Sequence, residues 1–134
     1  MAMNQEMLVR IISPTSIVLE CNAVIATIPG ERGEFGVLVE HVPLIANLHP
    51  GIMKVSVHHS DFEYFIYGGM AQVTAEEVNV ATEFAVDLKS IKKTKIIDKI
   101  NSFKEEIAIE TDSDRICDIT HDLERYESLL SFLK

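Results

Sequence analysis

Several features that would point to a particular function are scarce or missing in this sequence of 134 residues. It has no Trp and only two cysteines, Cys21 and Cys117, which lie far apart in the chain. We therefore expect two reduced thiols rather than a disulfide. No apolar run approaches the ~18 residues of a membrane span, and no secretory signal is visible at the start. The hydrophobic content of 47% is ordinary for a soluble globular protein with one core domain.

Positive charge is scarce in the first two thirds of the chain. The net charge is −9 overall, which argues against a nucleic-acid partner, because phosphate backbones attract Lys and Arg. Residues 1–86 hold 3 basic and 10 acidic side chains, whereas residues 87–134 hold 9 basic and 11 acidic ones. This break predicts two domains, residues 1–86 and residues 87–134.

The first domain has the pattern of many short β-strands. Val, Ile, Thr, Phe and Tyr are frequent, and Pro, Gly, Asn and Asp bound the runs. Such strands in a compact domain predict an antiparallel β-sandwich or barrel. The expected strands are Met7–Ile12, Ser16–Glu20, Ala23–Ile28, Gly36–Val39, Ile52–His58, Glu63–Tyr67, Ala71–Thr74 and Val78–Thr82.

After Phe84 the apolar spacing changes to three or four residues, which is typical of amphipathic helices. Asp87 is the expected N-cap of the first helix, and residues 110–113 are the expected turn. The fold class is therefore an N-terminal β-sandwich or barrel followed by a C-terminal antiparallel two-helix hairpin. The expected apolar positions are Leu88, Ile91, Ile96, Ile97, Ile100, Phe103 and Ile107, then Ile116, Ile119, Leu123, Tyr126, Leu130 and Leu133.

The two expected helices carry opposite charge. The first is rich in Lys and the second in Asp and Glu. Two explanations are open: the two helices complement one another at their exposed faces, or the lysines dock on an acidic partner. The lysines are Lys89, Lys92, Lys93, Lys95, Lys99 and Lys104.

No residue pattern indicates bond chemistry. The glycines at 30, 33 and 36 lack the Gly-Lys-[Ser/Thr] ending of a P-loop and the Gly-x-Gly-x-x-Gly spacing of a dinucleotide site, so they predict turns. His58 and His59 are adjacent, so in a strand they face opposite sides and cannot share a metal. We predict no catalytic residue, no metal and no cofactor.

Residues 33–51 hold the most informative motifs, because glycines and prolines there shape turns between short apolar runs. Gly33-Glu34-x-Gly36, His41-x-Pro43 and Leu48-x-Pro50-Gly51 occur in order, followed by Tyr64-Phe65-Ile66-Tyr67-Gly68-Gly69. This pattern resembles the epsilon subunit of F-type, rotary, proton-translocating ATP synthases. The chain departs from the family at Val39 and Glu40, where the family usually has Pro-Gly, which leaves the shape of that turn open.

The resemblance implies a non-catalytic central-stalk subunit. It would couple rotation of the membrane rotor ring to the gamma subunit and, through the helical arm, contact the alpha/beta catalytic head and inhibit ATP hydrolysis. It implies a peripheral location on the cytoplasmic face of the bacterial inner membrane. The residues that match the family's interface positions or shape them are Glu31, Gly33, Glu34, Gly36, His41 and Pro43.

Some epsilon subunits bind regulatory ATP through a motif like Ile/Leu-Asp-x-x-Arg-Ala. The matching positions here carry Lys92, Lys95 and Ile96 in place of Asp, Arg and Ala. Loss of the acceptor and of the planar guanidinium argues against ATP binding, so Lys92 and Lys95 are weak candidates.

Two other functions remain open from the sequence alone. One is a free-standing sandwich adaptor that binds a partner through its hairpin, and the other is a small enzyme with scattered carboxylates.

Overall fold

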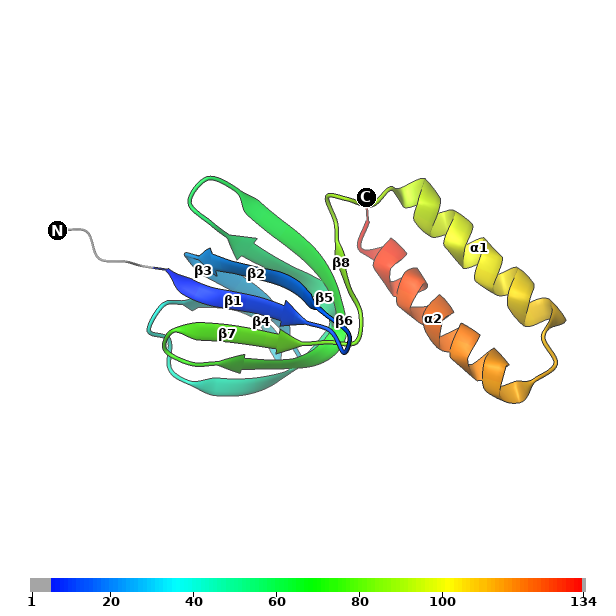
Figure 1. Cartoon of the computed structure of the whole chain (residues 1–134), viewed down its shortest axis with the longest axis horizontal. Helices are drawn as coiled ribbons and strands as arrows, with labels where there is room; N and C mark the ends of the chain where they lie inside the picture. Colours follow the sequence, from blue (N-terminus) through cyan, green and yellow to red (C-terminus); the bar gives the residue numbers. More distant parts are fainter. Residues whose placement is uncertain (1–5, 134) are drawn as a thin grey trace. The chain divides into compact units, whose positions relative to one another are not determined.

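A computed structural model describes residues 6–133 of the chain. Eight strands come first and two helices follow, as Figure 1 shows. This arrangement confirms the predicted fold class. The elements are β1 (Met7–Ile12), β2 (Ile17–Ala23), β3 (Ile25–Gly30), β4 (Gly33–Leu38), β5 (Leu44–Ser56), β6 (Asp61–Val73), β7 (Glu77–Ala81), β8 (Ala85–Asp87), α1 (Lys93–Ile109) and α2 (Ser113–Ser131).

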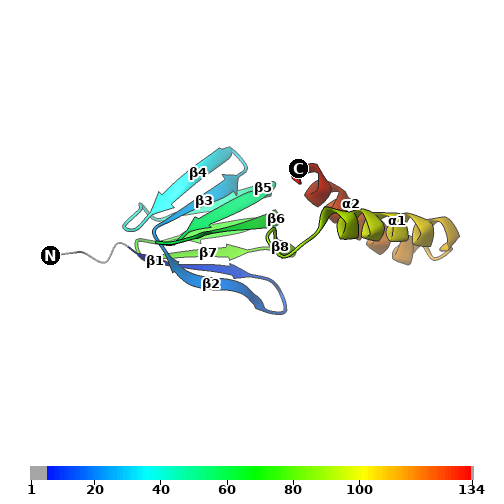
Figure 2. The ribbon, with the colours of Figure 1, turned by 90° about the horizontal axis from the view of Figure 1, so that it is seen from above.

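The strands form a sandwich because β5 and β6 are long enough to belong to both layers. The second half of β6 pairs with β7, which continues to β1 and β2. The first half of β6 pairs with β8, and the second half of β5 pairs with β3, which continues to β4. Figure 2 shows β3 and β4 in one layer and β1, β2 and β7 in the other.

The corner between the layers lies where β5 and β6 bend together. Gly68 and Gly69 have φ of 80° and 119°, a region that favours glycine. Leu48 pairs with Gly69, and Pro50 pairs with Tyr67, on the two sides of the bend. The glycine pair and the Pro50 position, both visible in the sequence, therefore mark the corner of the sandwich.

The core lies between the two layers and follows the period of two that strands impose. Met53 and Val55 are fully buried, whereas Lys54 between them is exposed. From the other layer, Val9, Ile11 and Val80 are also fully buried in the same cluster. The alternation of apolar and polar residues along these strands thus matches their buried and exposed faces.

Several strand boundaries differ from the prediction. Residues 44–56 form one strand, and so do residues 61–73, because paired bends replace the turns expected near Gly51 and Gly69. The strand β8 was not predicted, because three residues carry little periodicity. Most ladders are antiparallel as expected, but β1 and β7 pair in parallel.

The first helix begins later than predicted. Asp87 lies in β8 rather than at an N-cap, and the N-cap residue of α1 is Lys92, which makes no side-chain cap bond. The Asp87 carboxylate accepts a hydrogen bond from the N–H of Lys89 instead, at 2.9 Å. In α2 the cap is Asp112, whose side chain accepts from the N–H of Asp114.

The helices pack as an antiparallel pair joined by a short loop. The rings of Phe103 and Tyr126, one from each helix, lie 5.5 Å apart between centroids. In the loop, the Glu110 carboxylate accepts hydrogen bonds from two backbone N–H groups and lies 3.1 Å from Arg115. These contacts, led by the bond from the N–H of Asp112, lower the pKa of Glu110.

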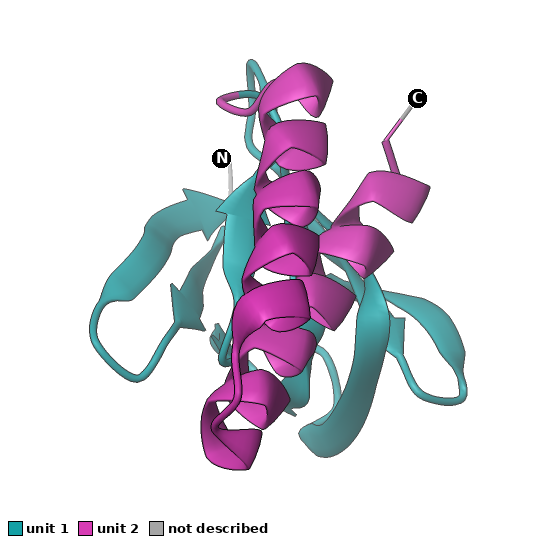
Figure 3. Cartoon of the chain, turned by 90° about the vertical axis from the view of Figure 1, so that its right-hand side faces the viewer, with its two compact units in different colours: residues 1–89 teal, residues 90–134 magenta. Residues whose placement is uncertain are grey.

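The chain divides into two compact units, residues 1–89 and residues 90–134, coloured in Figure 3. The predicted boundary between residues 86 and 87 falls inside β8. Since β8 pairs with β6, the residues up to Asp87 are held by the sandwich through their backbone.

Candidate functional site

The predicted interface residues lie on the edge strand β4 and on the two turns that flank it. Glu31 belongs to the turn between β3 and β4, and Gly33, Glu34 and Gly36 lie on β4, which is an edge strand. His41 and Pro43 lie between β4 and β5, at the other end of β4, about 20 Å away for six residues of strand. All six are exposed except His41, which is half-buried.

The turn between β3 and β4 is a tight two-residue hairpin. Gly30 pairs with Gly33, so that Glu31 and Arg32 form the loop. Gly33 has φ of 127°. A Cβ on Gly30 would lie 2.8 Å from the Phe35 ring, so glycine is required there too. The glycine spacing that resembled a phosphate motif therefore serves turn geometry.

This hairpin is attached to the first half of β5. The N–H of Glu31 donates to the carbonyl oxygen of Asn47 at 2.8 Å. The hairpin and β5 enclose an open groove of about 510 Å³, lined on the β5 side by Leu44, Ile45, Ala46 and Asn47. Leu44 and Ile45 also line a second, smaller hollow with Pro43, so the start of β5 links Pro43 to the hairpin that carries Glu31 and Gly33.

Sequence reasoning missed the residues of β5 that line this groove. Ile45 is 68% exposed, which is unusual for a large apolar side chain in a strand. The apolar run Leu44–Leu48 was visible, but it did not indicate which side chains would face outward. The pairing of Ile45 with Gln72 places both on the outer face.

Residues 38–41, which lead from β4 toward β5, form a tight turn even though Val39 and Glu40 stand where the family usually has Pro-Gly. The N–H of His41 donates to the carbonyl oxygen of Leu38 at 3.2 Å, which closes a four-residue turn. Glu40, its third residue, has φ of 66°. A positive φ at that position is typical of a type II turn, which Pro-Gly would also form. His41 Nδ1 lies 2.8 Å from the Val42 carbonyl oxygen.

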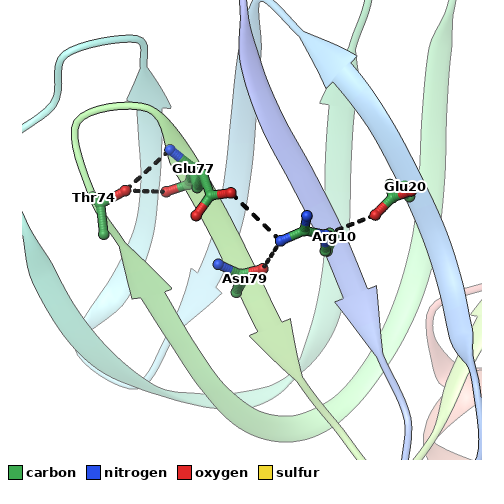
Figure 4. Close-up of polar contacts among 5 residues, drawn as sticks. All are labelled: Arg10, Glu20, Thr74, Glu77 and Asn79. Carbon is green, nitrogen blue, oxygen red and sulfur yellow. Dashed lines mark hydrogen bonds and ion pairs between the residues drawn. The ribbon is translucent and has the colours of Figure 1, made fainter.

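A separate polar cluster lies on the outer face of the β1 layer (Figure 4). The Arg10 guanidinium lies 2.7 Å from Glu20 and 3.5 Å from Glu77, and it donates to Asn79 at 3.3 Å. The hydrogen bond with Glu20 is the main reason that the pKa of Arg10 is raised. Arg10 links β1 to the neighbouring strands β2 and β7, so these contacts stabilise the sheet.

The described residues offer neither an activated Cys21 thiol nor a cluster of metal-binding side chains. Burial raises the pKa of the Cys21 thiol, which keeps it protonated and weakly nucleophilic at neutral pH. No group of three or more His, Cys, Asp or Glu side chains in residues 6–133 is arranged to hold a metal ion. None of the helices in this range combines the length and apolar character that crossing a bilayer requires.

The exposed lysines of the arm are left without carboxylate partners from the other helix. In the described part of the chain, no ion pair joins a lysine of α1 to an acid of α2. Among the described residues of this unit, ion pairs join Arg115 to Glu110 and Arg125 to Asp122, in both cases with an acid that does not come from the facing helix. Lys92 and Lys95 lie exposed at the start of α1, and their role toward ATP stays a prediction.

Comparison with known proteins decides the family. Residues 6–88 match the family model described as ATP synthase, Delta/Epsilon chain, beta-sandwich domain. The chain belongs to this ATP synthase family. An ATP synthase epsilon chain of Rickettsia rickettsii is 44% identical over 101 residues, which cover 73% of this chain and 90% of that relative. The epsilon chain of Rickettsia bellii is 37% identical over 108 residues and is covered completely.

Solved ATP synthase structures share the fold across both units. A chain of the Euglena gracilis mitochondrial ATP synthase assembly OSCP/F1/c-ring aligns with a TM-score of 0.68 at 24% identity, covering 98% of this chain and 83% of that one. A chain of the Tetrahymena thermophila central stalk and c-ring aligns with a TM-score of 0.57 at 13% identity, covering 94% and 97%. Membership of the epsilon family confirms the resemblance and the prediction of a non-catalytic ATP synthase subunit.

Proposed function

We propose that this epsilon-family chain is a rotor subunit of the central stalk. Its sandwich binds the gamma subunit and rests on the membrane rotor ring, so that rotation of the ring turns the stalk beneath the alpha/beta catalytic head. The observation that carries this proposal is the exposed surface formed by the β3–β4 hairpin and the first residues of β5, which together line a groove next to Pro43. Its two rigid turns, exposed carboxylates and exposed Ile45 suit contact with a protein partner.

Family membership supports the gamma subunit and the ring as partners, because the relatives are bacterial ATP synthase epsilon chains. The same relationship supports a peripheral position on the cytoplasmic face of the bacterial inner membrane. In this arrangement Glu31 and Glu34 contact the ring, and His41 with Pro43 faces gamma. Gly33 and Gly36 give the surface its shape.

The gamma contact is tested by co-expressing this chain with the gamma subunit of the same enzyme. We expect a 1:1 complex on gel filtration, both for the full chain and for residues 1–89. Ile45→Asp should weaken the complex at least about tenfold, because the charge must be desolvated in the interface. Ile17→Asp is the matched control, since Ile17 is 57% exposed on β2, outside the proposed surface.

Two separate peaks for the wild-type chain and gamma would disprove the rotor assignment. Equal binding by the Ile45 and Ile17 variants would leave the partner in place but move the interface away from β5. Circular dichroism of both variants confirms that the sandwich is folded in each case.

We propose further that the arm, residues 90–134, restrains ATP hydrolysis by docking its lysines on an acidic surface of the catalytic head. The exposed lysines of α1 support this, because α2 does not neutralise them by ion pairs. The switch would require the arm to adopt two arrangements that differ in contacts with the head.

Removing residues 90–134 should raise ATP hydrolysis by the assembled enzyme several-fold. Exchanging Lys95 and Lys99 for Glu should release the inhibition as truncation does, because attraction to the head becomes repulsion. The Lys95→Arg, Lys99→Arg variant keeps the charge and should hydrolyse ATP at the wild-type rate. An unchanged rate after truncation would remove the inhibitory role and leave the coupling role intact.

A further inference from the structure

The turn between β4 and β5 holds an unusual backbone conformation. Glu40 is the one non-glycine residue in the described range 6–133 with a positive φ, 66°. Most residues other than Gly disfavour a positive φ, although Asn tolerates it better than the others. Gly or Asn is therefore the usual choice at the third position of a type II turn. Contacts around Glu40 must therefore hold the bend in place.

One such contact comes from a turn on the other layer of the sandwich. The N–H of Glu40 donates to the carbonyl oxygen of Ala75 at 2.7 Å, a shorter bond than the one that closes the β4–β5 turn itself. Ala75 belongs to the turn between β6 and β7. The pairing of Leu44 with Val73, at the adjoining ends of β5 and β6, brings the two turns together.

The β6–β7 turn is itself rigid. The N–H of Thr74 donates to the carbonyl oxygen of Glu77 at 2.9 Å. The Thr74 hydroxyl oxygen accepts from the N–H of Glu77 at 3.1 Å, as Figure 4 shows. Val73 and Val78 then pair as the first residues of the β6–β7 ladder. These hydrogen bonds therefore fix the position of the Ala75 carbonyl oxygen, which accepts from the Glu40 N–H.

We propose that the β6–β7 turn positions the β4–β5 turn for its partner, with Glu40 as the positioning residue. The Ala75 hydrogen bond holds Glu40 in its left-handed conformation, and this conformation sets the direction in which His41 and Pro43 leave the sheet. The backbone of residue 40, rather than its carboxylate, carries this role. The inference rests on the proposed function, in which His41 and Pro43 face the gamma subunit.

Three substitutions in the full chain separate backbone conformation from charge. Glu40→Gly, Glu40→Asn and Glu40→Val all remove the carboxylate, but only Gly and Asn tolerate a positive φ. We expect the Gly and Asn variants to bind gamma with wild-type affinity. The Val variant should bind about tenfold more weakly, because a β-branched residue strains this conformation.

Amide hydrogen exchange at residue 40, followed by NMR, gives a readout that does not depend on gamma. We expect slow exchange in the wild type and in the Gly and Asn variants, and fast exchange in the Val variant. Thr74→Val provides a second route, because it loosens the β6–β7 turn without touching residue 40. It should speed exchange of the Glu40 N–H and weaken gamma binding several-fold.

Equal affinities and equal exchange rates across the Gly, Asn and Val variants would overturn the proposal. An equal loss of gamma binding in all three would assign the role to the carboxylate and overturn it as well. If the Val variant fails to fold, Thr74→Val decides, and unchanged exchange at residue 40 would contradict the positioning role. Failure of the wild-type chain to bind gamma refutes the proposed function, while the exchange series still tests the link between the turns.

Discussion

Gly69→Ala is expected to cost the sandwich about 4 kcal/mol of unfolding free energy or more, from two additive effects. Gly69 has φ of 119°, which L residues rarely adopt. An added Cβ would also lie 2.1 Å from the backbone carbonyl oxygen of Ala81, which β7 holds in place. A domain of this size has only about 5–15 kcal/mol to lose. Urea denaturation followed by circular dichroism measures the effect.

Gly33→Ala is the matched control for this substitution. Gly33 has a similar φ of 127°, but nothing lies within 4 Å of an added Cβ. The Gly33→Ala variant should therefore lose only the part of the unfolding free energy that comes from the strained φ, about 1–3 kcal/mol. Equal losses in the two variants would show that the clash at the corner of β5 and β6 is relieved by movement of β7. Because the corner directs β5 toward the groove, Gly69→Ala should also disturb the proposed interface.

Ile11→Ala should destabilise the sandwich by about 2–5 kcal/mol, the range for deleting a buried Ile side chain. Ile11 is 0% exposed and faces the core, where its strand neighbours are Leu19 on β2 and Val80 on β7. The surrounding layers are joined by β5 and β6, which limits how far they can collapse into the cavity. The midpoint of urea unfolding should fall, while the slope with urea stays unchanged.

Ile17→Ala provides the comparison on the same hairpin. Ile17 is 57% exposed, so its loss should cost less than about 1 kcal/mol. The difference between the two losses of unfolding free energy measures the effect of burial, because the same side chain is truncated in both variants. If both variants lost the same stability, the layer that contains β1 would not be packed as the structure describes.

The strand pattern of the sequence located most of the sandwich because alternation is a local signal. In the expected strand Ile52–His58, Met53 and Val55 are buried and Lys54 between them is exposed, as the pleat requires. Local patterns could not tell that residues 44–56 form one bent strand, since Pro50 and Gly51 are typical of a turn as well as of a bend. Only the paired bend at Gly68 and Gly69 in β6 distinguishes the two.

Both helices were predicted in type, but the first residue of α1 was not. Asp87 is a good N-cap by composition, yet backbone pairing of Tyr64 with Asp87 takes it into the sheet. A ladder between β6 and β8 depends on residues far apart in sequence, so capping preference could not foresee it. By contrast, the turn around Glu110 and Asp112 was predicted well, because its signals lie within a few residues.

The candidate site was predicted in part. The glycines and prolines of residues 33–51 indicated a shaped surface, and Glu31, Glu34, His41 and Pro43 remain the predicted interface residues. Phe35, Ile45 and Asn47 were missed, although they line the groove. The groove forms where the β3–β4 hairpin meets the start of β5, so no single segment contains its pattern.

The sequence by itself determined the class of the chain. Its composition, its change from a period of two to steps of three and four, and its ordered glycine and proline motifs specify a sandwich, a helical hairpin and the epsilon family. The tertiary structure decided which residues of β5 are exposed and how Glu40 is held in a left-handed conformation. The first depends on the pairing of β5 with β6, and the second depends on the hydrogen bond from the Glu40 N–H to Ala75. Both join segments that local preferences cannot bring together.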